Sequence, residues 1–590
     1  ARGRRKRRAG VRRAGLVLAG IGALAAAPAF GQQYGAPAPG AAAPAPGAAA
    51  APAAPGGATG PAAPETRIPG LPTGIGIPGQ VVLPPGGGAP PSFDLRNPNE
   101  IIGFQLQLSA QQEEILTDNA RGTANGGTLS AGSNGIVTTS GTGKKVGDLI
   151  SRTTPILTAF DRTPRLEFGL NYSPSYEKFL NAADQDRFDN TLTATGTAQL
   201  WQEHLSLSAS ASVSRQFINN QGAITPGNQF TNNNQTDVET YTVSPVYTQR
   251  FGSFATGRLQ YLLGSTSSGV LASTLQNTVQ ASLASGPDFG ALFWQGSLLD
   301  SESSQGSTPN AGQLINGVVT PTASANTSQR TAQLSSAYAL NHTVSLLSGI
   351  GYDDIENGTL GGNIKGPFGD FGIGLAGSRL SLTLLYNLRY NGQFASAQGS
   401  YAITPRLLLS GSYNESITTT QNQLINNTAG LGLTPTGNFI NSATQQNFNP
   451  VNSSFGINSG LGNSIFHEKL GQLALNGTHD RNVYALTLQT ETRTSGTANF
   501  NESDVTITGS YDREISPSTH YNLSLGFIAT DQRSPASTST DTYNATTGFT
   551  YKLAETVTAT ASYSFIYRTS SQAGQTTSDN QLLLGLRKDF

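Results

Sequence analysis

Apolar and polar residues alternate along many segments of this chain from about residue 102 onward. The segment 205–213 reads Leu, Ser, Leu, Ser, Ala, Ser, Ala, Ser, Val, and the segments 521–527 and 557–565 repeat this alternation. The segment 380–390 follows it with one exception, Leu385. Because successive side chains of a β-strand point to opposite faces, each segment has one apolar and one polar face. The pattern therefore predicts an all-β protein.

Two features of these segments favour a transmembrane barrel over a soluble β-sandwich, the alternative fold with the same alternation. The better segments are about ten residues long, which matches a tilted bilayer crossing rather than the usual five or six residues of a strand. Their polar faces carry Ser, Thr, Asn, Gln and Arg with little apolar bulk, as expected for the wet interior of a barrel.

Short and long connections alternate along the chain, and this predicts the organisation of the barrel. Ten tight turns are expected at 161–165, 201–204, 250–253, 286–290, 341–343, 376–379, 404–406, 479–482, 516–519 and 553–556. Longer polar stretches lie between them, the largest at 421–465. Short periplasmic turns and long extracellular loops are typical of bacterial barrels. Ten turns and eleven loops join about 22 strands, within a range of about 18–24, in an antiparallel up-and-down barrel.

The last segment of the chain has the pattern of a closing strand. Phe590 shares one face with Leu586, Leu584 and Leu582, and only Lys588 interrupts the apolar series. This ending resembles the C-terminal signal that the barrel-assembly machinery of Gram-negative outer membranes reads. We therefore expect these apolar residues to act as an assembly signal.

The residues before the barrel predict export. Eight Arg or Lys residues within 2–13 precede an apolar run at 16–27 that is too short to span a bilayer as a helix. Residues 1–31 are therefore interpreted as a signal peptide, and the small residues Ala27/Ala29 or Ala29/Gly31 offer two cleavage sites. Residues 32–96 are rich in Pro, Ala and Gly, and this composition predicts a disordered periplasmic linker. The barrel is assigned to residues 97–590.

Composition and charge exclude several classes of function. The net charge of -1 gives no support for nucleic-acid binding, which needs a clustered basic surface. The absence of cysteine excludes disulfides, thiolate metal sites and cysteine nucleophiles. The five histidines show no pairing at metal-ligand spacing, and most of them fall beside predicted turns. Asp353, Asp354 and Glu356 could hold Ca²⁺, but they lack the spaced oxygens of a dedicated loop. We expect no catalytic residue, no metal, no cofactor and no enzymatic activity.

The polar parity of the predicted strands places several charged side chains inside the barrel. The candidate lumen-lining residues are Arg258, Arg389, Arg493, Arg568, Glu167 and Glu491. They would fill the lumen and pair across strands, or they would form an electrostatic filter. Their signs are mixed, so no ion selectivity follows. Arg215 lies on the apolar parity of its strand and is expected at a strand end, at the membrane interface.

Several segments resemble the outer-membrane β-barrel proteins associated with exosortase/PEP-CTERM exopolysaccharide systems. The matching stretches are 117–119, GDLISRTTP at 147–155, LWQEHL at 200–205, 351–352, 389–392 and SGSYNESITTT at 410–420. The resemblance spans roughly residues 105–590, although Asn391 stands where the family has an aromatic residue and 421–465 is long. It implies an outer-membrane location near exopolysaccharide production and supplies no catalytic residues.

The preferred function is a porin-like passive conduit for polar solute or exopolysaccharide. A TonB-dependent receptor would need a folded plug domain, for which 32–96 is too short and too rich in proline. A non-transporting barrel that adheres to polymer through its long loops is the alternative. About 22 strands enclose more space than wall side chains fill, so the lumen is expected to hold water or an inserted loop. The best candidate for such an insert is 421–465, and the alternative is that this segment is an extracellular loop with no gating role. The expected partners are outer-membrane lipid and lipopolysaccharide, the barrel-assembly machinery, and exopolysaccharide or periplasmic export components.

Overall fold

The computed structural model describes most of the predicted barrel. The described residues are 102–120, 129–131, 137–139, 145–217, 235–269, 272–306, 314–315, 318–319, 326–357, 364–389, 392–433, 439–441, 465–495, 500–533, 537–571 and 576–590. The expected signal peptide and linker lie outside the described residues.

One antiparallel sheet forms the wall of the molecule. Its strands are β1 (Ile102–Thr117), β4 (Asp148–Arg162), β5 (Leu166–Tyr172), β6 (Ser175–Phe179), β7 (Arg187–Asp189), β8 (Leu192–Trp201), β9 (Leu205–Phe217), β10 (Gln235–Phe251), β11 (Ala255–Ser268), β12 (Thr274–Ser285), β13 (Leu292–Gln305), β16 (Thr327–Ala339), β17 (Val344–Asn357), β18 (Ile364–Ala376), β19 (Leu380–Arg389), β20 (Gly392–Thr404), β21 (Leu407–Thr419), β24 (Ile465–His479), β25 (Asn482–Ser495), β26 (Phe500–Ser516), β27 (Thr519–Gln532), β28 (Thr538–Ala554), β29 (Val557–Ser570) and β30 (Thr577–Asp589).

Short elements complete the described structure. They are the hairpins β2 (Leu129–Ala131) with β3 (Val137–Thr139), β14 (Leu314–Ile315) with β15 (Val318–Val319), and β22 (Leu431–Leu433) with β23 (Phe439–Asn441), the helix α2 (Thr420–Ala429), and the 3₁₀ turns η2 (Ala183–Gln185) and η5 (Pro287–Phe289). None of the helices in the described ranges is long and apolar enough to cross a membrane.

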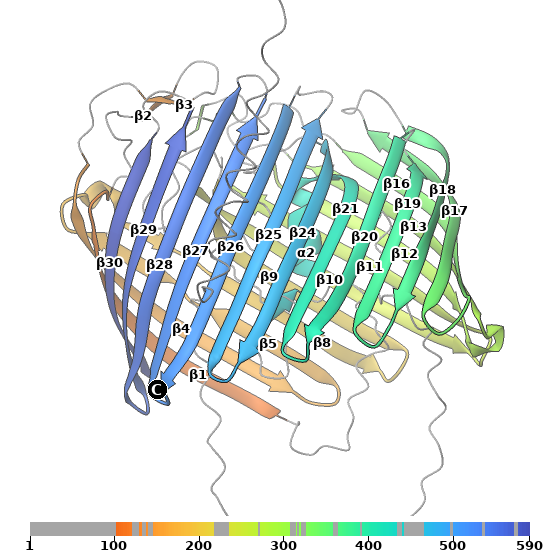
Figure 1. Ribbon diagram of the computed structural model, residues 1–590, viewed down its shortest axis with the longest axis horizontal. Helices are drawn as coiled ribbons and strands as arrows, with labels where there is room; N and C mark the ends of the chain where they lie inside the picture. Colours follow the sequence, from red (N-terminus) through yellow and green to blue (C-terminus); the bar gives the residue numbers. More distant parts are fainter. Residues whose placement is uncertain are drawn as a thin grey trace, which may run out of the picture.

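The sheet closes into a barrel of 22 strand positions, as the sequence predicted (Figure 1). Sequence neighbours pair along the whole wall, and β30 pairs with β1 to close it. Two positions hold two short strands each. β5 and β6 both pair with β4, and β7 and β8 continue along the next position. Pro174 lies in the break between β5 and β6, where its missing N–H cannot serve a ladder.

All ten predicted tight turns connect consecutive wall strands, from the turn after β4 to the turn after β28. They lie at one end of the barrel, which we call the turn end, together with the end of β30 (Figure 1). The longer connections lie at the opposite end, called the loop end, where the β2–β3 hairpin is visible (Figure 1). The alternation of connections along the chain therefore separates the two ends of the barrel.

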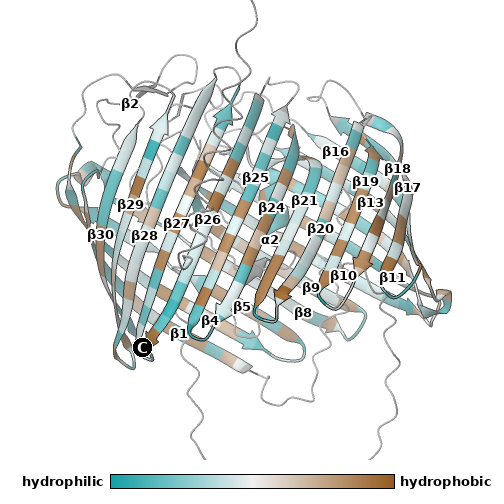
Figure 2. Cartoon of the chain, in the orientation of Figure 1, coloured by the Kyte–Doolittle hydropathy of each residue, from teal (hydrophilic) through white to brown (hydrophobic). Residues whose placement is uncertain are grey.

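Apolar side chains face outward and polar side chains face inward, which is the reverse of a soluble protein. Leu384 is 41% exposed on the outer face of β19, whereas its neighbour Thr383 is 5% exposed on the inner face. Ile350 is 68% exposed and Glu491 only 1%. Figure 2 shows the resulting brown apolar segments on the wall strands. An apolar outer surface around a polar interior, with every strand paired, is the arrangement of a transmembrane β-barrel, because lipid cannot satisfy an open sheet edge.

Aromatic side chains mark one boundary of the apolar surface, at the turn end. The ring of Trp201 lies 4.5 Å from that of His204 and 6.4 Å from that of Tyr247, measured between ring centroids. Phe289 packs 5.4 Å from both Phe254 and Trp294. Girdles of aromatic residues occupy the membrane–water interface of barrels. Both tryptophans of the chain therefore lie at the interface nearest the tight turns.

The seam between β1 and β30 is held by side chains as well as by backbone pairing. At the loop end, Asn580 donates to Asp118 from its backbone N at 2.9 Å and from Nδ2 at 2.7 Å. Burial raises the pKa of the Asp118 carboxyl, but these hydrogen bonds and the charge of Lys145 outweigh it and lower the pKa overall. At the turn end, the backbone N of Phe590 donates to the Leu108 carbonyl at 2.9 Å.

Deletion of Phe590 is expected to reduce assembly of the barrel far more than deletion of one residue from 121–128. The first change removes a closing hydrogen bond and the outermost aromatic of the apolar face formed by Leu582, Leu584 and Leu586, whereas loop tips tolerate change. The heat-modifiable electrophoretic migration of the protein in membrane fractions measures the fraction of the protein that has folded. Equal folded shares for the two deletions would contradict the assembly role.

Candidate functional site: the lumen and its insert

The six predicted lumen residues lie on the inner, polar parity of their strands, and four of them are almost fully buried. The buried ones are Arg389, Arg493, Arg568 and Glu491. The structure brings together one pair of the six, because the Arg493 Nε donates to Glu491 at 2.5 Å. Arg258 donates to Gln260 at 2.6 Å, and Glu167 accepts from Arg162 near the turn end. Their action on a passing solute stays a prediction.

An ion network near β4, β6, β7 and β9 was not predicted from the sequence. Glu177 Oε2 lies 2.9 Å from the Arg187 Nη2, and Glu177 Oε1 lies 3.5 Å from the Arg152 Nη1. Asp189 lies 3.0 Å from Arg187 and also contacts Arg215. Arg215 is thus held in this network, near the loop end of its strand. No alternation marks Glu177 in the sequence SYEKF, and the two short strands there interrupt the pattern.

The acidic segment considered for Ca²⁺ is divided between the two faces of β17. Asp353 faces inward and binds Arg389 through both carboxylate oxygens, and its Oδ1 also accepts from Thr331 at 2.8 Å. Asp354 and Glu356 face outward and lie 2.9 and 3.4 Å from the Lys365 Nζ. Within the described ranges, no three His, Asp or Glu residues are placed to hold a metal ion.

The candidate insert enters the lumen in its described part. The helix α2 begins directly after β21, where the Thr419 side chain caps it by accepting from the Asn422 backbone N at 3.1 Å. Figure 1 shows the helix inside the barrel, between the front and back walls. A polar helix of ten residues is marginal in water. Leu424 and Ile425 are almost fully buried, and each such burial contributes roughly 1.5–3 kcal/mol, so the wall stabilises the helix.

Glycines on the inner wall receive the apolar side chains of the insert. A Cβ at Gly264 of β11 would lie 2.2 Å from the Ile425 Cγ2, and Ile425 also packs on Leu262. A Cβ at Gly169 of β5 would lie 2.7 Å from the Leu433 Cδ2. Any other residue at these two positions would displace the insert. We call Gly264 and Gly169 the wall sockets.

Polar contacts fix the insert on the β24–β25 wall and on β8. Gln423 donates to Glu468 of β24 and accepts from the Arg493 Nη2 at 3.2 Å. The Thr195 hydroxyl of β8 donates to the Leu431 carbonyl at 3.2 Å. The segment is thus bound to walls that lie far apart around the barrel.

The insert also crosses most of the height of the barrel. It leaves the wall at Thr419, at the loop end, and reaches Gly169, only three residues from Leu166, where β5 begins beside a tight turn. At about 3.3 Å per residue, Gly169 lies within about 10 Å of the start of β5. The described part of the insert therefore passes from the loop end to the lower third of the lumen.

No protein-family model and no curated protein matches this chain. Three solved structures that it resembles are the siderophore receptor PirA from Pseudomonas aeruginosa (11% identity, TM-score 0.38, covering 82% of this chain and 80% of that one), the FrpB iron transporter of Neisseria meningitidis, F5-1 variant (10%, 0.43, 83% and 83%), and PirA from Acinetobacter baumannii (8%, 0.43, 83% and 81%). At such identities, what those proteins bind says nothing about what this chain binds.

Proposed function

We propose that this chain is a passive conduit of the Gram-negative outer membrane, whose lumen is narrowed by the insert formed by α2, β22 and β23. The observation that carries the proposal is the docking of the insert inside a lumen lined with polar side chains. The inner faces of β8, β9 and β10 carry hydroxyls, and Thr195 and Ser210 bond each other at 2.9 Å. Inner-face side chains such as Gln398 and Ser412 are exposed on the β20–β21 wall. A polar inner surface suits a polar solute.

The resemblance to exosortase/PEP-CTERM-associated barrels makes a nascent exopolysaccharide a candidate solute. Charges of both signs line the described inner wall, and most of them are already paired, as Arg389 is with Asp353. A weakly charged lumen of hydroxyl and amide groups favours neutral polar polymers over a strongly charged solute. The alternative function is a barrel that adheres to polymer through its outer connections without transport.

The decisive experiment removes the insert. Thr419 and Ile465 are register partners, so a two-residue Asn-Gly turn can replace residues 420–464 without moving β21 or β24. We expect a higher single-channel conductance in planar bilayers than for the intact chain, because the lumen loses the segment that crosses it. Heat-modifiable migration verifies that the barrel has folded.

A point substitution tests the same constriction with the insert still present. Gly264→Val places a Cβ where Ile425 now lies, so α2 should leave its socket and the conductance should rise. Gly366→Val is the matched control, since a Cβ at this inner glycine of β18 meets no atom within 4 Å. Unchanged conductance in both the replacement and Gly264→Val would reject the constriction. The complete lack of conductance in every variant would reject the conduit and favour the adhesion barrel.

A further inference from the structure

β20 and β21 have no backbone register pairs in the part of their seam nearest the loop end. The register runs from Thr404 opposite Leu407 only to Ala397 opposite Tyr413. Beyond that pair, β20 continues to Gly392 and β21 to Thr419, and each stays paired only along its other edge, with β19 and β24. Five residues of β20 at about 3.3 Å each make an unpaired stretch of roughly 16 Å. Both strands have 13 residues, so they run beside each other over this stretch without register pairs.

One ring contact reaches across the unpaired stretch, and residues of β21 and β24 surround it. The Phe394 ring of β20 lies 4.9 Å from the His467 ring of β24, measured between centroids. Glu415, whose side chain is buried, lies 3.2 Å from the His467 Nε2 and 3.3 Å from the Lys469 Nζ. The Tyr413 hydroxyl donates to Glu415 at 2.8 Å. We call these five residues the side-chain latch. A few side-chain contacts hold less firmly than a continuous ladder of backbone hydrogen bonds.

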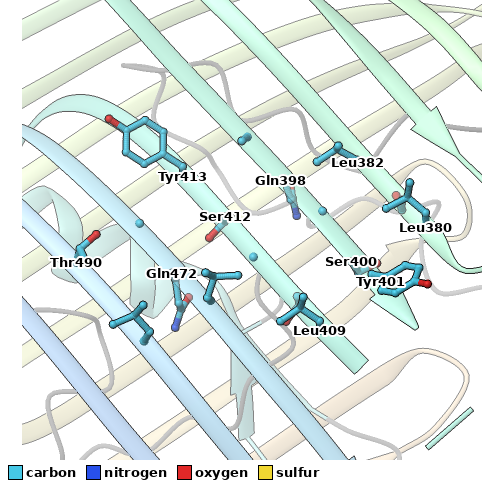
Figure 3. A pocket seen from close by; sticks show the side chains of 18 residues that line it. Leu380, Leu382, Gln398, Ser400, Tyr401, Leu409, Ser412, Tyr413, Gln472 and Thr490 are labelled. Carbon is cyan, nitrogen blue, oxygen red and sulfur yellow. The ribbon is translucent and has the colours of Figure 1, made fainter. Parts of the chain in front are cut away.

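A hollow on the lipid-facing side of this wall reaches up to Tyr413 of the latch (Figure 3). It has a volume of about 420 Å³, within the range of small-molecule sites. Three outward glycines line it, namely Gly399, Gly411 and Gly471, together with Leu473 and Tyr401. The lining is almost entirely apolar, as an acyl chain requires. We call this hollow the glycine groove.

The lumen side and the lipid side of the β20–β21 wall differ in polarity. The latch lies on this wall between the glycine groove and the loop end. Gln398 and Ser412 are register partners on the lumen side, next to the glycines of the groove (Figure 3). Lys469 is half-exposed above the groove. An ammonium group has three N–H donors, so Lys469 can donate to an anion while it stays paired with Glu415. This juxtaposition of apolar hollow and cationic upper end matches one class of molecule, an amphiphile with an acyl chain and an anionic head group.

We propose that the β20–β21 seam is a lateral passage by which such an amphiphile moves between the lumen and the outer leaflet. The acyl chain lies in the glycine groove, the head group contacts Lys469, and the latch opens to admit the molecule to the lumen. The proposal rests on the conduit function, because it assumes an accessible lumen. It also connects the seam to the insert, since Glu468 lies between His467 and Lys469 in β24 and binds Gln423 of α2.

Photolabelling tests the passage without ion flow, so a barrel that does not conduct still gives an answer. The probe is lysophosphatidylglycerol with a diazirine at the end of its single acyl chain, in phosphatidylcholine vesicles that contain the full chain. Mass spectrometry of the labelled peptides distinguishes the groove strands from α2. We expect label on the segment around Gly411 and Leu473, and also on α2 inside the lumen.

Tethering the seam separates lateral entry from entry through the mouths of the barrel. The chain has no cysteine, so Ser396→Cys with Asn414→Cys, the next positions beyond the last register pair, can be joined by a short bismaleimide. We expect this tether to abolish label on α2 and to leave label in the groove. The control tether joins Ser400→Cys to Ser410→Cys, register partners in the paired part of the seam, and should leave both. Label on α2 that survives the upper tether, or no label on α2 before tethering, would overturn the passage.

A substitution tests the head-group contact. Lys469→Gln removes the cation above the groove, and it should lower groove labelling by lysophosphatidylglycerol but not by lysophosphatidylcholine carrying the same diazirine chain. The Lys469→Gln variant and the tethered forms are compared with the original chain only after heat-modifiable migration shows that all of them fold to the same extent. Equal labelling of the variant and the original chain by the anionic probe would refute the role of Lys469.

Discussion

Asp353→Ala is expected to lower the free energy of unfolding by about 3 kcal/mol, because it leaves a buried guanidinium without its carboxylate. The Arg389 side chain has no exposed surface, and Asp353 contacts it with both oxygens. Arg389 also stacks over the Phe368 ring, 4.3 Å from its centroid. Removal of one partner from a buried pair usually costs about 3–5 kcal/mol. The lower figure applies here because Asp370 also interacts electrostatically with Arg389.

A double variant distinguishes the lost charge pair from a packing defect. Asp353→Ala combined with Arg389→Met removes both charges and keeps apolar volume beside Phe368, so most of the stability should return. Urea titrations of the protein in phospholipid vesicles give the free energies of unfolding. If the double variant were as unstable as Asp353→Ala alone, the loss would come from packing rather than from the uncompensated charge.

Leu384→Arg is expected to lower the free energy of unfolding by roughly 2–4 kcal/mol, the cost of an arginine on the lipid face near the bilayer midplane. Leu384 lies in the middle of β19, on the outer face, where water is excluded once the barrel is in a membrane. The same urea titration measures the loss. In detergent, where hydration of the side chain is easier, the loss should be smaller.

The control for Leu384→Arg is an arginine on the lumen side of the same wall. Thr383, the neighbour of opposite parity, is closely packed. Gln398, its register partner on β20, has an exposed side chain and offers room for the longer residue. Gln398→Arg should change the free energy of unfolding little. Equal losses for Leu384→Arg and Gln398→Arg would contradict the assignment of an outer lipid face and an inner wet face.

The sequence predicted the wall of the barrel well because the wall obeys local rules. The alternation in 380–390 identified which face of β19 is outside, and the exception Leu385 is indeed buried on the inner face, where it packs near Ala337 and Leu347. The tight turns were predictable for the same reason, since a break in a period-two pattern is visible within a few residues. The segment 421–465 was a candidate insert only because of its length and its few apolar residues.

The helix α2 could not be predicted as a helix. Its residues, TQNQLINNTA, include several poor helix formers and show only a short apolar pair, Leu424 and Ile425. Its stability depends on the socket at Gly264, which lies more than 150 positions earlier in the chain. The side-chain latch escaped prediction for a similar reason. Glu415, His467 and Lys469 come together only because β21 and β24 are register partners across the insert.

The closure of the wall by β1 and β30 determines when the barrel can finish folding. Ser109 hydrogen-bonds to Asp589 at 2.7 Å, across 480 positions of sequence, and the same register runs to Thr117 opposite Gln581. All other wall pairs join strands that are close along the chain, so hairpins can form early while this one contact must wait for β30. Until then β1 and β29 are bare sheet edges, which invite pairing with other chains. Contacts of such high sequence separation form slowly. The intermediate in which both sheet edges are exposed is therefore the state that chaperones must protect from aggregation.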